Sequence, residues 1–218
     1  MQEIIFGLVS FVLAGFAFGF GAFRLFRRKK PLYLQLLVCA VGCFALQRLS
    51  GIVNLWCGVT ETVSVGMLGI FGCNFFLFSA NYGTLDGVVD DGRESKKARV
   101  LAIIAPVVTA MLAAAAFLVW KERDMFSAVM WLVMYAPALP ASYFNLKHIF
   151  LPMDPFEFLR ATRPGNIAAL VFYTVTAAYI IGTACAGSTV SGILSILMSL
   201  SAFSLTLSAI EGGKRWGI

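Results

Sequence analysis

Arg48 is a charged side chain inside an otherwise uncharged apolar stretch that runs from Leu32 to Trp56. A guanidinium binds a carboxylate or a phosphate through two parallel hydrogen bonds. The acidic residues of the chain lie at or beyond the ends of its apolar stretches, and Glu61 is the nearest of them beyond Trp56. Arg48 therefore predicts a binding site for an anion. The alternative is that the stretch shifts within a membrane, so that Arg48 reaches lipid head groups or Glu61.

Uncharged polar side chains recur near the middle of other apolar stretches. With each stretch centred in a bilayer at about 1.5 Å of rise per residue, Asn74, Tyr135 and Tyr173 fall near the middle. Arg48 and Tyr179 fall in one half of the membrane. Polar groups in lipid need partners, so these side chains predict a solute site in which Arg48 attracts the anionic group and the others donate or accept hydrogen bonds or stack. Alternatively, each tyrosine packs against its neighbours and bonds to a carbonyl.

Pro137 and Pro140 stand in the segment YAPALPASYFN, inside another apolar stretch. Proline removes a backbone hydrogen bond from a helix and bends it. The bend leaves backbone carbonyl oxygens for a neighbouring helix, water or a ligand. The two prolines therefore predict a kinked helix beside the proposed site.

Four carboxylates gather in a polar segment, at Asp86, Asp90, Asp91 and Glu94. Such a cluster is able to hold a divalent cation in a lipid-modifying enzyme. The favoured alternative is a capping box, because Asp91 and Glu94 have the spacing that begins a helix. An enzyme is accordingly the least favoured class of function.

The chain has five cysteines and one histidine, His148, and no two cysteines form a CxxC pair. A zinc site needs several Cys or His ligands at suitable spacing, so no metal centre is expected. No cofactor is expected either, since the last apolar stretch has no lysine that could form a Schiff base with retinal. Cys57 follows one apolar stretch and Cys185 is the last residue of another, and both lie on the same predicted side. We predict a disulfide between them if that side is oxidising.

Composition places the chain among membrane proteins. The 218 residues are 60% hydrophobic and 13% charged, whereas soluble domains are about 45–50% apolar and about 25% charged. The formal net charge of +6 is explained by basic loops, and no binding of nucleic acid is expected.

Apolar runs long enough to cross a bilayer predict an all-α bundle of seven transmembrane helices in one domain that spans residues 1–218. The run from 164 to 210 is too long for one span, and we divide it at Ala186 to Ser188. The predicted spans are 4–23, 32–56, 62–85, 100–120, 125–146, 165–185 and 189–210.

Basic residues predict the orientation. Of the 17 Lys and Arg residues, all but Arg48, Lys121 and Arg123 follow the first, third or fifth span or lie in the tail. Loops rich in Lys and Arg stay in the cytoplasm. The N-terminus is therefore predicted outside and the C-terminus inside.

The favoured function is binding, and translocation, of a small polar or anionic solute through the bundle. The alternative is a sensor or accessory subunit that docks on a partner membrane protein through helix faces rich in Gly, Ala and Ser. Compact loops favour the cytoplasmic membrane of a prokaryote.

Overall fold

The computed structural model describes residues 2–27, 30–58, 66–86, 96–151 and 158–215, and every regular element within these ranges is a helix. Carboxylates Asp90, Asp91 and Glu94 lie outside these ranges, so neither the cation site nor the capping box is described. The helices are α1 (Gln2–Leu25), α2 (Leu32–Trp56), α3 (Met67–Asn81), η1 (Tyr82–Asp86), α4 (Lys96–Ala102), α5 (Ile104–Lys121), α6 (Met125–Tyr135), α7 (Ala138–Phe150), α8 (Phe158–Cys185) and α9 (Ser188–Arg215).

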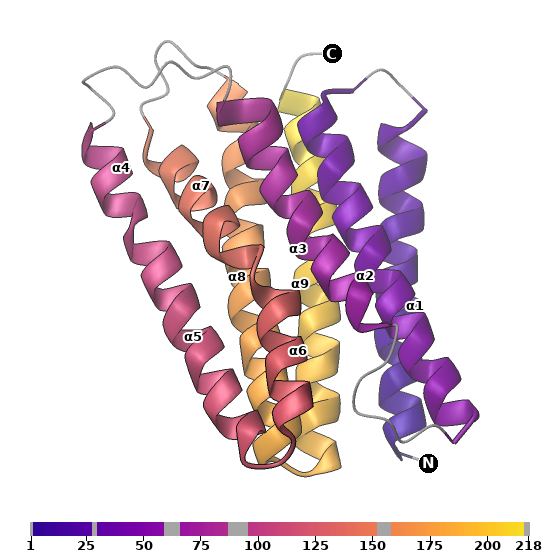
Figure 1. The fold of residues 1–218 in the computed structure, drawn as a ribbon. Coiled ribbons are helices and arrows are strands. Elements are labelled where there is room, and N and C mark those ends of the chain that lie inside the picture. Colours follow the sequence, from indigo (N-terminus) through magenta and orange to yellow (C-terminus); the bar gives the residue numbers. More distant parts are fainter. Residues whose placement is uncertain (1, 28–29, 59–65, 87–95, 152–157, 216–218) are drawn as a thin grey trace.

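The helices form one elongated bundle in which successive passes run in opposite directions (Figure 1). Neighbours around the bundle are α1, α2, α3, α7, α8 and α9, and α9 closes the ring by packing against α1. Helix α2 also contacts α9, which places α2 near the centre. Helix α5 lies outside the ring, where Trp120 donates a hydrogen bond from Nε1 to the carbonyl oxygen of Ile180 on α8 at 2.9 Å.

Six helical segments are long and apolar enough to cross a membrane. They are Gln2–Leu25, Leu32–Trp56, Lys96–Lys121, Met125–Phe150, Phe158–Cys185 and Ser188–Arg215. The third expected span, 62–85, begins in residues that lie outside the described ranges. Its described part is α3, with 15 residues, followed by the five-residue π-helix η1. With or without α3, the described chain therefore has the six to seven apolar helices of a polytopic membrane protein.

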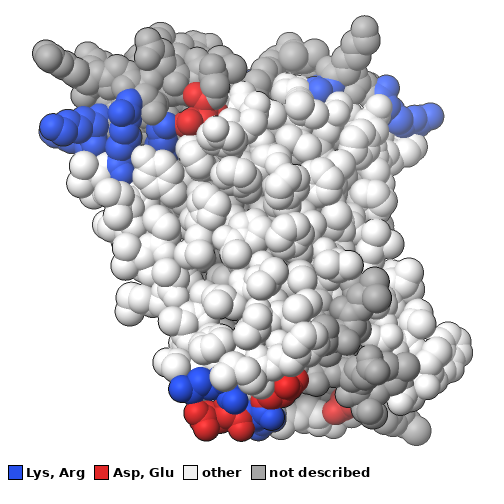
Figure 2. Space-filling view, in the orientation of Figure 1, with Lys and Arg blue, Asp and Glu red and all other residues white. Residues whose placement is uncertain are grey.

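The outer surface of the bundle is apolar between two charged ends. On the face in Figure 2, Lys, Arg, Asp and Glu gather at the two ends, and other residues cover the space between. Large apolar side chains such as Phe16, Met111 and Phe126 are exposed on the outer surface of the bundle. Lipid tails would cover such side chains without cost.

Small residues allow α1 and α9 to approach each other closely. A Cβ atom on Gly192 of α9 would stand 2.2 Å from the ring of Phe6 on α1. At the other end, a Cβ on Gly21 would stand 2.9 Å from the Thr206 side chain and 3.0 Å from Val38. Larger residues would push the helices apart. The α1–α9 contact is therefore fixed by glycine at both ends.

Candidate functional site

Arg48 lies inside the bundle, between α2, α8 and α9. Its side chain is 6% exposed. Nη1 donates to Ser195 Oγ at 3.0 Å, and Nη2 lies 2.9 Å from the sulfur of Met198. The guanidinium carbon is 4.8 Å from the centre of the Phe44 ring and 4.7 Å from that of Tyr179. Two aromatic rings and α9 thus hold the guanidinium away from the lipid-facing surface.

No carboxylate in the described part of the chain forms an ion pair with Arg48. Its Nε atom is also buried without a hydrogen-bond partner. Aromatic rings stabilise a buried cation only in part, and a buried charge without a counterion is costly. The guanidinium therefore retains both charge and a donor that an anion could use.

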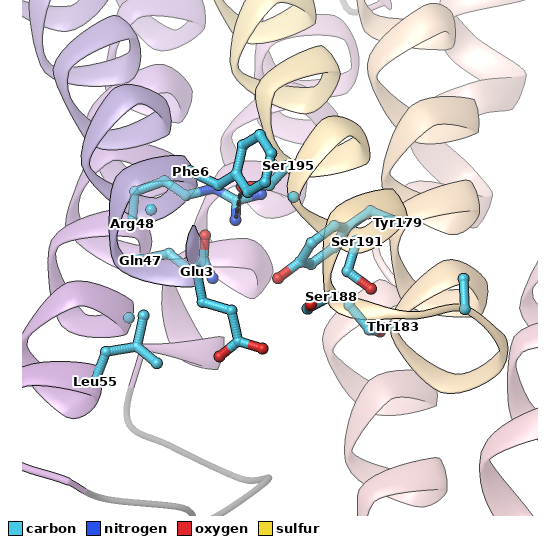
Figure 3. A pocket seen from close by; sticks show the side chains of 14 residues that line it. Glu3, Phe6, Gln47, Arg48, Leu55, Tyr179, Thr183, Ser188, Ser191 and Ser195 are labelled. Carbon is cyan, nitrogen blue, oxygen red and sulfur yellow. Dashed lines mark hydrogen bonds between the residues drawn. The ribbon is translucent and has the colours of Figure 1, made fainter. Parts of the chain in front are cut away.

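Arg48 lines a pocket of about 350 Å³. The pocket lies between the first turns of α1, the last turns of α2 and α8, and the first turns of α9, at the end of the bundle that holds the N-terminus (Figure 3). The polar side chains that line it with Arg48 are Glu3, Gln47, Tyr179, Thr183, Ser188, Ser191 and Ser195. The apolar part of the wall includes Phe6 and Leu55.

Serine hydroxyls connect Arg48 to the α1–α9 contact. Ser195 Oγ, which accepts from Arg48, donates to Ser10 Oγ of α1 at 3.1 Å. The hydroxyls of Ser10 and Ser199 are 2.5 Å apart, and Ser10 also bonds to the carbonyl oxygen of Ser195 at 3.1 Å. This buried group fixes the pocket floor by joining three helices.

The structure brings Arg48 and Tyr179 together, but it places the other three predicted site residues away from the pocket lining. Asn74 donates to the carbonyl oxygen of Met134 at 3.2 Å. The Tyr135 hydroxyl donates to the carbonyl oxygen of Tyr173 at 2.8 Å. These polar groups therefore hold helices together in the core.

The prolines lie where α6 ends and α7 begins. Helix α6 stops at Tyr135, and α7 starts at Ala138 with Pro137 in its N-cap position. Pro140 lies in the first turn of α7, where its missing N–H leaves no bond unmade inside the helix. The break frees the carbonyl oxygen of Met134, which accepts from Asn74. A neighbouring helix thus occupies the acceptor that the break exposes.

A second buried polar cluster, around His148, lies at the opposite end of the bundle. Asn81 Nδ2 donates to Asn145 Oδ1 at 2.5 Å, and Asn145 Nδ2 donates to the Tyr173 hydroxyl at 3.2 Å. His148 Nδ1 is 2.8 Å from Asn81 Oδ1. Because an amide oxygen accepts, we assign His148 Nδ1 as the donor of this hydrogen bond.

Asp86, the last residue of η1, faces this cluster. Its Oδ1 atom is 3.7 Å from His148 Nε2 and 2.5 Å from Lys147 Nζ. The contact with His148 is longer than a hydrogen bond, whereas the contact with Lys147 is short and charged. His148 and Lys147 together lower the pKa of the Asp86 carboxyl below its usual value. The π-helix thus ends on an ion pair that is almost buried.

Several of these residues were not identified from the sequence. Ser10 is the only hydroxyl-bearing residue between Ile4 and Phe23, and that isolation could have marked it. Asn81 and Asn145 lie near the ends of apolar stretches, where polar residues are ordinary. Nothing in the sequence indicates that they meet.

Within the described ranges, no group of three or more His, Cys, Asp or Glu side chains is placed to hold a metal ion. Cys57 and Cys185 are free and exposed in the structure. Both end helices at the pocket end of the bundle. Their disulfide stays a prediction.

No protein-family model matches the sequence, and neither a curated protein nor a solved structure matches it. The functional argument therefore proceeds from the chemistry of the Arg48 pocket.

Proposed function

We propose that the chain is an integral membrane protein that binds a small polar or anionic solute at Arg48 and carries it across the bilayer. One observation supports this most directly. A buried guanidinium, with no ion pair to the described residues, lines a pocket of about 350 Å³. Pockets for small molecules begin at about 300 Å³ and contain few, well-placed polar groups. The solute is accordingly small.

The N-terminal end of α9 adds to the attraction for an anion. Ser188, the first residue of α9, lines the pocket together with Ser191 one turn later. The N-terminus of a helix has a partial positive charge and backbone N–H groups without acceptors inside the helix. Arg48 and α9 thus favour negative charge in the same pocket.

The contact between α1 and α9 offers a route for translocation. At the far end of this contact lies a second cavity, of about 300 Å³, lined in part by Arg24, Arg27 and Lys214. Between the two cavities lie the Ser10 and Ser199 hydroxyls, and Thr206, whose hydroxyl is buried without a hydrogen-bond partner. We propose that α1 and α9 separate by turns at either end, so that the solute passes along these hydroxyls.

The proposed orientation places the Arg48 pocket outside. At the pocket end, the described basic residues between α5 and α6 are Lys121, the last residue of α5, and Arg123 in the turn that follows. The opposite end has far more Lys and Arg, in Figure 2 at the top. The positive-inside rule supports a cytoplasmic location for that end. The pocket would therefore receive solute from outside the cell.

Thermal unfolding in detergent tests the binding site. The ligands are carboxylates, phosphates, nucleotides, sugars and amino acids, and the proteins are the wild type, Arg48→Gln and the control Arg123→Gln at the same end. A ligand at about 100 times its Kd stabilises the folded state by about 2.7 kcal/mol. We expect one class of compound that carries a carboxylate or phosphate group, amino acids included, to stabilise the wild type and Arg123→Gln but not Arg48→Gln. Equal stabilisation of Arg48→Gln, or no stabilisation of the wild type by any compound with such a group, would overturn the proposal.

A further inference from the structure

Glu3 lies in the same pocket as Arg48 and restricts the kind of anion that fits there. The two side chains extend from α1 and α2 into one space, and the Glu3 carboxylate points away from the guanidinium (Figure 3). They form no ion pair with each other within 4.0 Å. A solute with only negative charge would be attracted by Arg48 and repelled by Glu3.

Two adjacent residues of α2 also present one unpaired donor and one unpaired acceptor, which call for a negative and a positive ligand group. Arg48 Nε is a buried donor without an acceptor, and Gln47 Oε1 is a buried acceptor without a donor. Both residues line the pocket. A buried polar group without a partner is costly, so each atom favours a ligand group of the complementary kind. An anion satisfies Arg48 but leaves Gln47 unsatisfied.

We infer that the pocket is built for a zwitterion of the amino-acid type. The carboxylate of the solute binds Arg48 beside the Ser195 hydroxyl and the first turn of α9. Its ammonium group lies toward Glu3 and donates to Gln47 Oε1. A zwitterion satisfies the charges on both walls, whereas a simple acid or a simple amine satisfies one wall and is repelled by the other.

The apolar part of the wall indicates what else the solute contains. Phe6 and Leu55 line the pocket beside the charged groups, and an uncharged, apolar side chain of the solute would contact them favourably. The Phe6 ring fills the space beside Gly192, where a Cβ atom would stand 2.2 Å from the ring. A larger residue at position 192 would therefore displace Phe6 from the pocket wall. The class of solute is therefore an amino acid with an uncharged, apolar side chain.

This inference rests on the proposed anion site at Arg48 and adds a requirement for a positive group. Matched ligands separate the two. Alanine with propionate, valine with isovalerate and phenylalanine with hydrocinnamate differ within each pair only by the ammonium group. Their affinities would be measured by titration calorimetry on the wild type, Glu3→Gln and Arg48→Gln. Glu122→Gln, a change of an exposed acid at the same end, is the control.

We expect the wild type and Glu122→Gln to bind at least one amino acid about tenfold or more tightly than its deaminated partner. Glu3→Gln should bring the two affinities to within about threefold, and Arg48→Gln should bind neither compound. A wild type that binds the simple acid as tightly as the amino acid overturns the zwitterion but keeps the anion site. The same holds if Glu3→Gln leaves the preference unchanged. If neither member of any pair binds the wild type, both the zwitterion and the proposed carboxylate site are wrong.

Discussion

Arg48 is better suited to binding a ligand than to stabilising the fold. It is buried, its Nε atom has no partner, and its contacts are one serine hydroxyl, one thioether sulfur and two aromatic rings. Replacing a whole buried ion pair by apolar residues of similar volume is often neutral or stabilising, by about 1–4 kcal/mol. Arg48 forms no ion pair with the described residues, so no counterion offsets the cost of burying its charge. A residue retained for binding would follow that pattern.

We therefore predict that Arg48→Met leaves the free energy of unfolding of the unliganded protein unchanged or raises it. The methionine side chain fills part of the space between Phe44 and Tyr179 without an unpaired charge. Chemical denaturation in detergent measures the effect, with Ser195→Ala as a comparison that removes the hydroxyl partner of Arg48 together with its hydrogen bond to Ser10. A loss of more than about 3 kcal/mol in Arg48→Met would mean that Arg48 mainly supports the fold.

Asp86 gives the protein a pH-dependent stability on the acid side. Its pKa is lower in the folded state because His148 and Lys147 face the carboxylate. A lowered pKa contributes stability that is complete above the ordinary value, near 4, and that is lost as the pH falls through the folded pKa. The ion pair with Lys147 should therefore weaken only in acid.

We predict that Asp86→Asn is less stable than the wild type at pH 7, by about 1–3 kcal/mol. The difference should shrink as the pH falls below about 4, because the wild-type carboxyl is then protonated as well. Melting temperatures from pH 7 to pH 3 measure it, and Glu122→Gln at the far end is the control. A difference that stays constant over this range would contradict the role assigned to the charge.

At the scale of elements, the break between α6 and α7 depends on a residue of α3. Asn74 supplies the hydrogen bond that the carbonyl oxygen of Met134 would otherwise receive within a continuous helix. An unpaired buried carbonyl costs about 1–3 kcal/mol. Asn74 therefore stabilises the break between α6 and α7.

We predict that Asn74→Leu lowers the free energy of unfolding by about 1–3 kcal/mol. In a Pro137→Ala background the loss should be smaller, because the helix can continue and Ala138 N–H can reach Met134. A double-mutant cycle from denaturation curves gives this coupling. Equal losses in both backgrounds would show that Asn74 does not compensate for the break.

The sequence predicted an all-helical, apolar chain because long apolar runs indicate membrane-spanning helices, and six to seven helices of the structure are long and apolar enough to cross a membrane. Which face of each helix meets a neighbour was harder to predict. Asn74, Tyr135 and Tyr173 share a depth with one another, but depth does not show which way a side chain points. Tyr179 meets Arg48 because α8 turns that face toward α2. The π-helix η1 forms the end of the third expected span, which was predicted to end at Leu85, and no local pattern in YGTLD indicates a π-helix. Pairings between distant helices, such as Asn81 with Asn145, arise only from packing.

At the scale of the whole molecule, the orientation can be tested through two exposed thiols at the pocket end. Cys57 and Cys185 are free and exposed. Single-cysteine versions would be treated, in intact cells, with a maleimide that does not cross membranes. We predict labelling at Cys57 and Cys185, and none at Lys214→Cys at the other end. The reverse pattern would contradict the proposed orientation.

The predicted disulfide is tested with the same reagents. A version that keeps only Cys57 and Cys185 would be labelled before and after treatment with a reductant. If the two thiols are joined, labelling should rise sharply after reduction. Equal labelling before and after would mean that they stay free at the membrane surface.

Solute flux tests the central claim most directly. The wild type, Arg48→Gln and Arg123→Gln would be reconstituted separately into liposomes. Each would be supplied with a radiolabelled form of the compound that most stabilises the wild type against thermal unfolding. We predict saturable uptake by the wild type and Arg123→Gln, and uptake by Arg48→Gln no greater than by empty liposomes. Wild-type uptake equal to that of empty liposomes would contradict translocation, even if the pocket binds the solute.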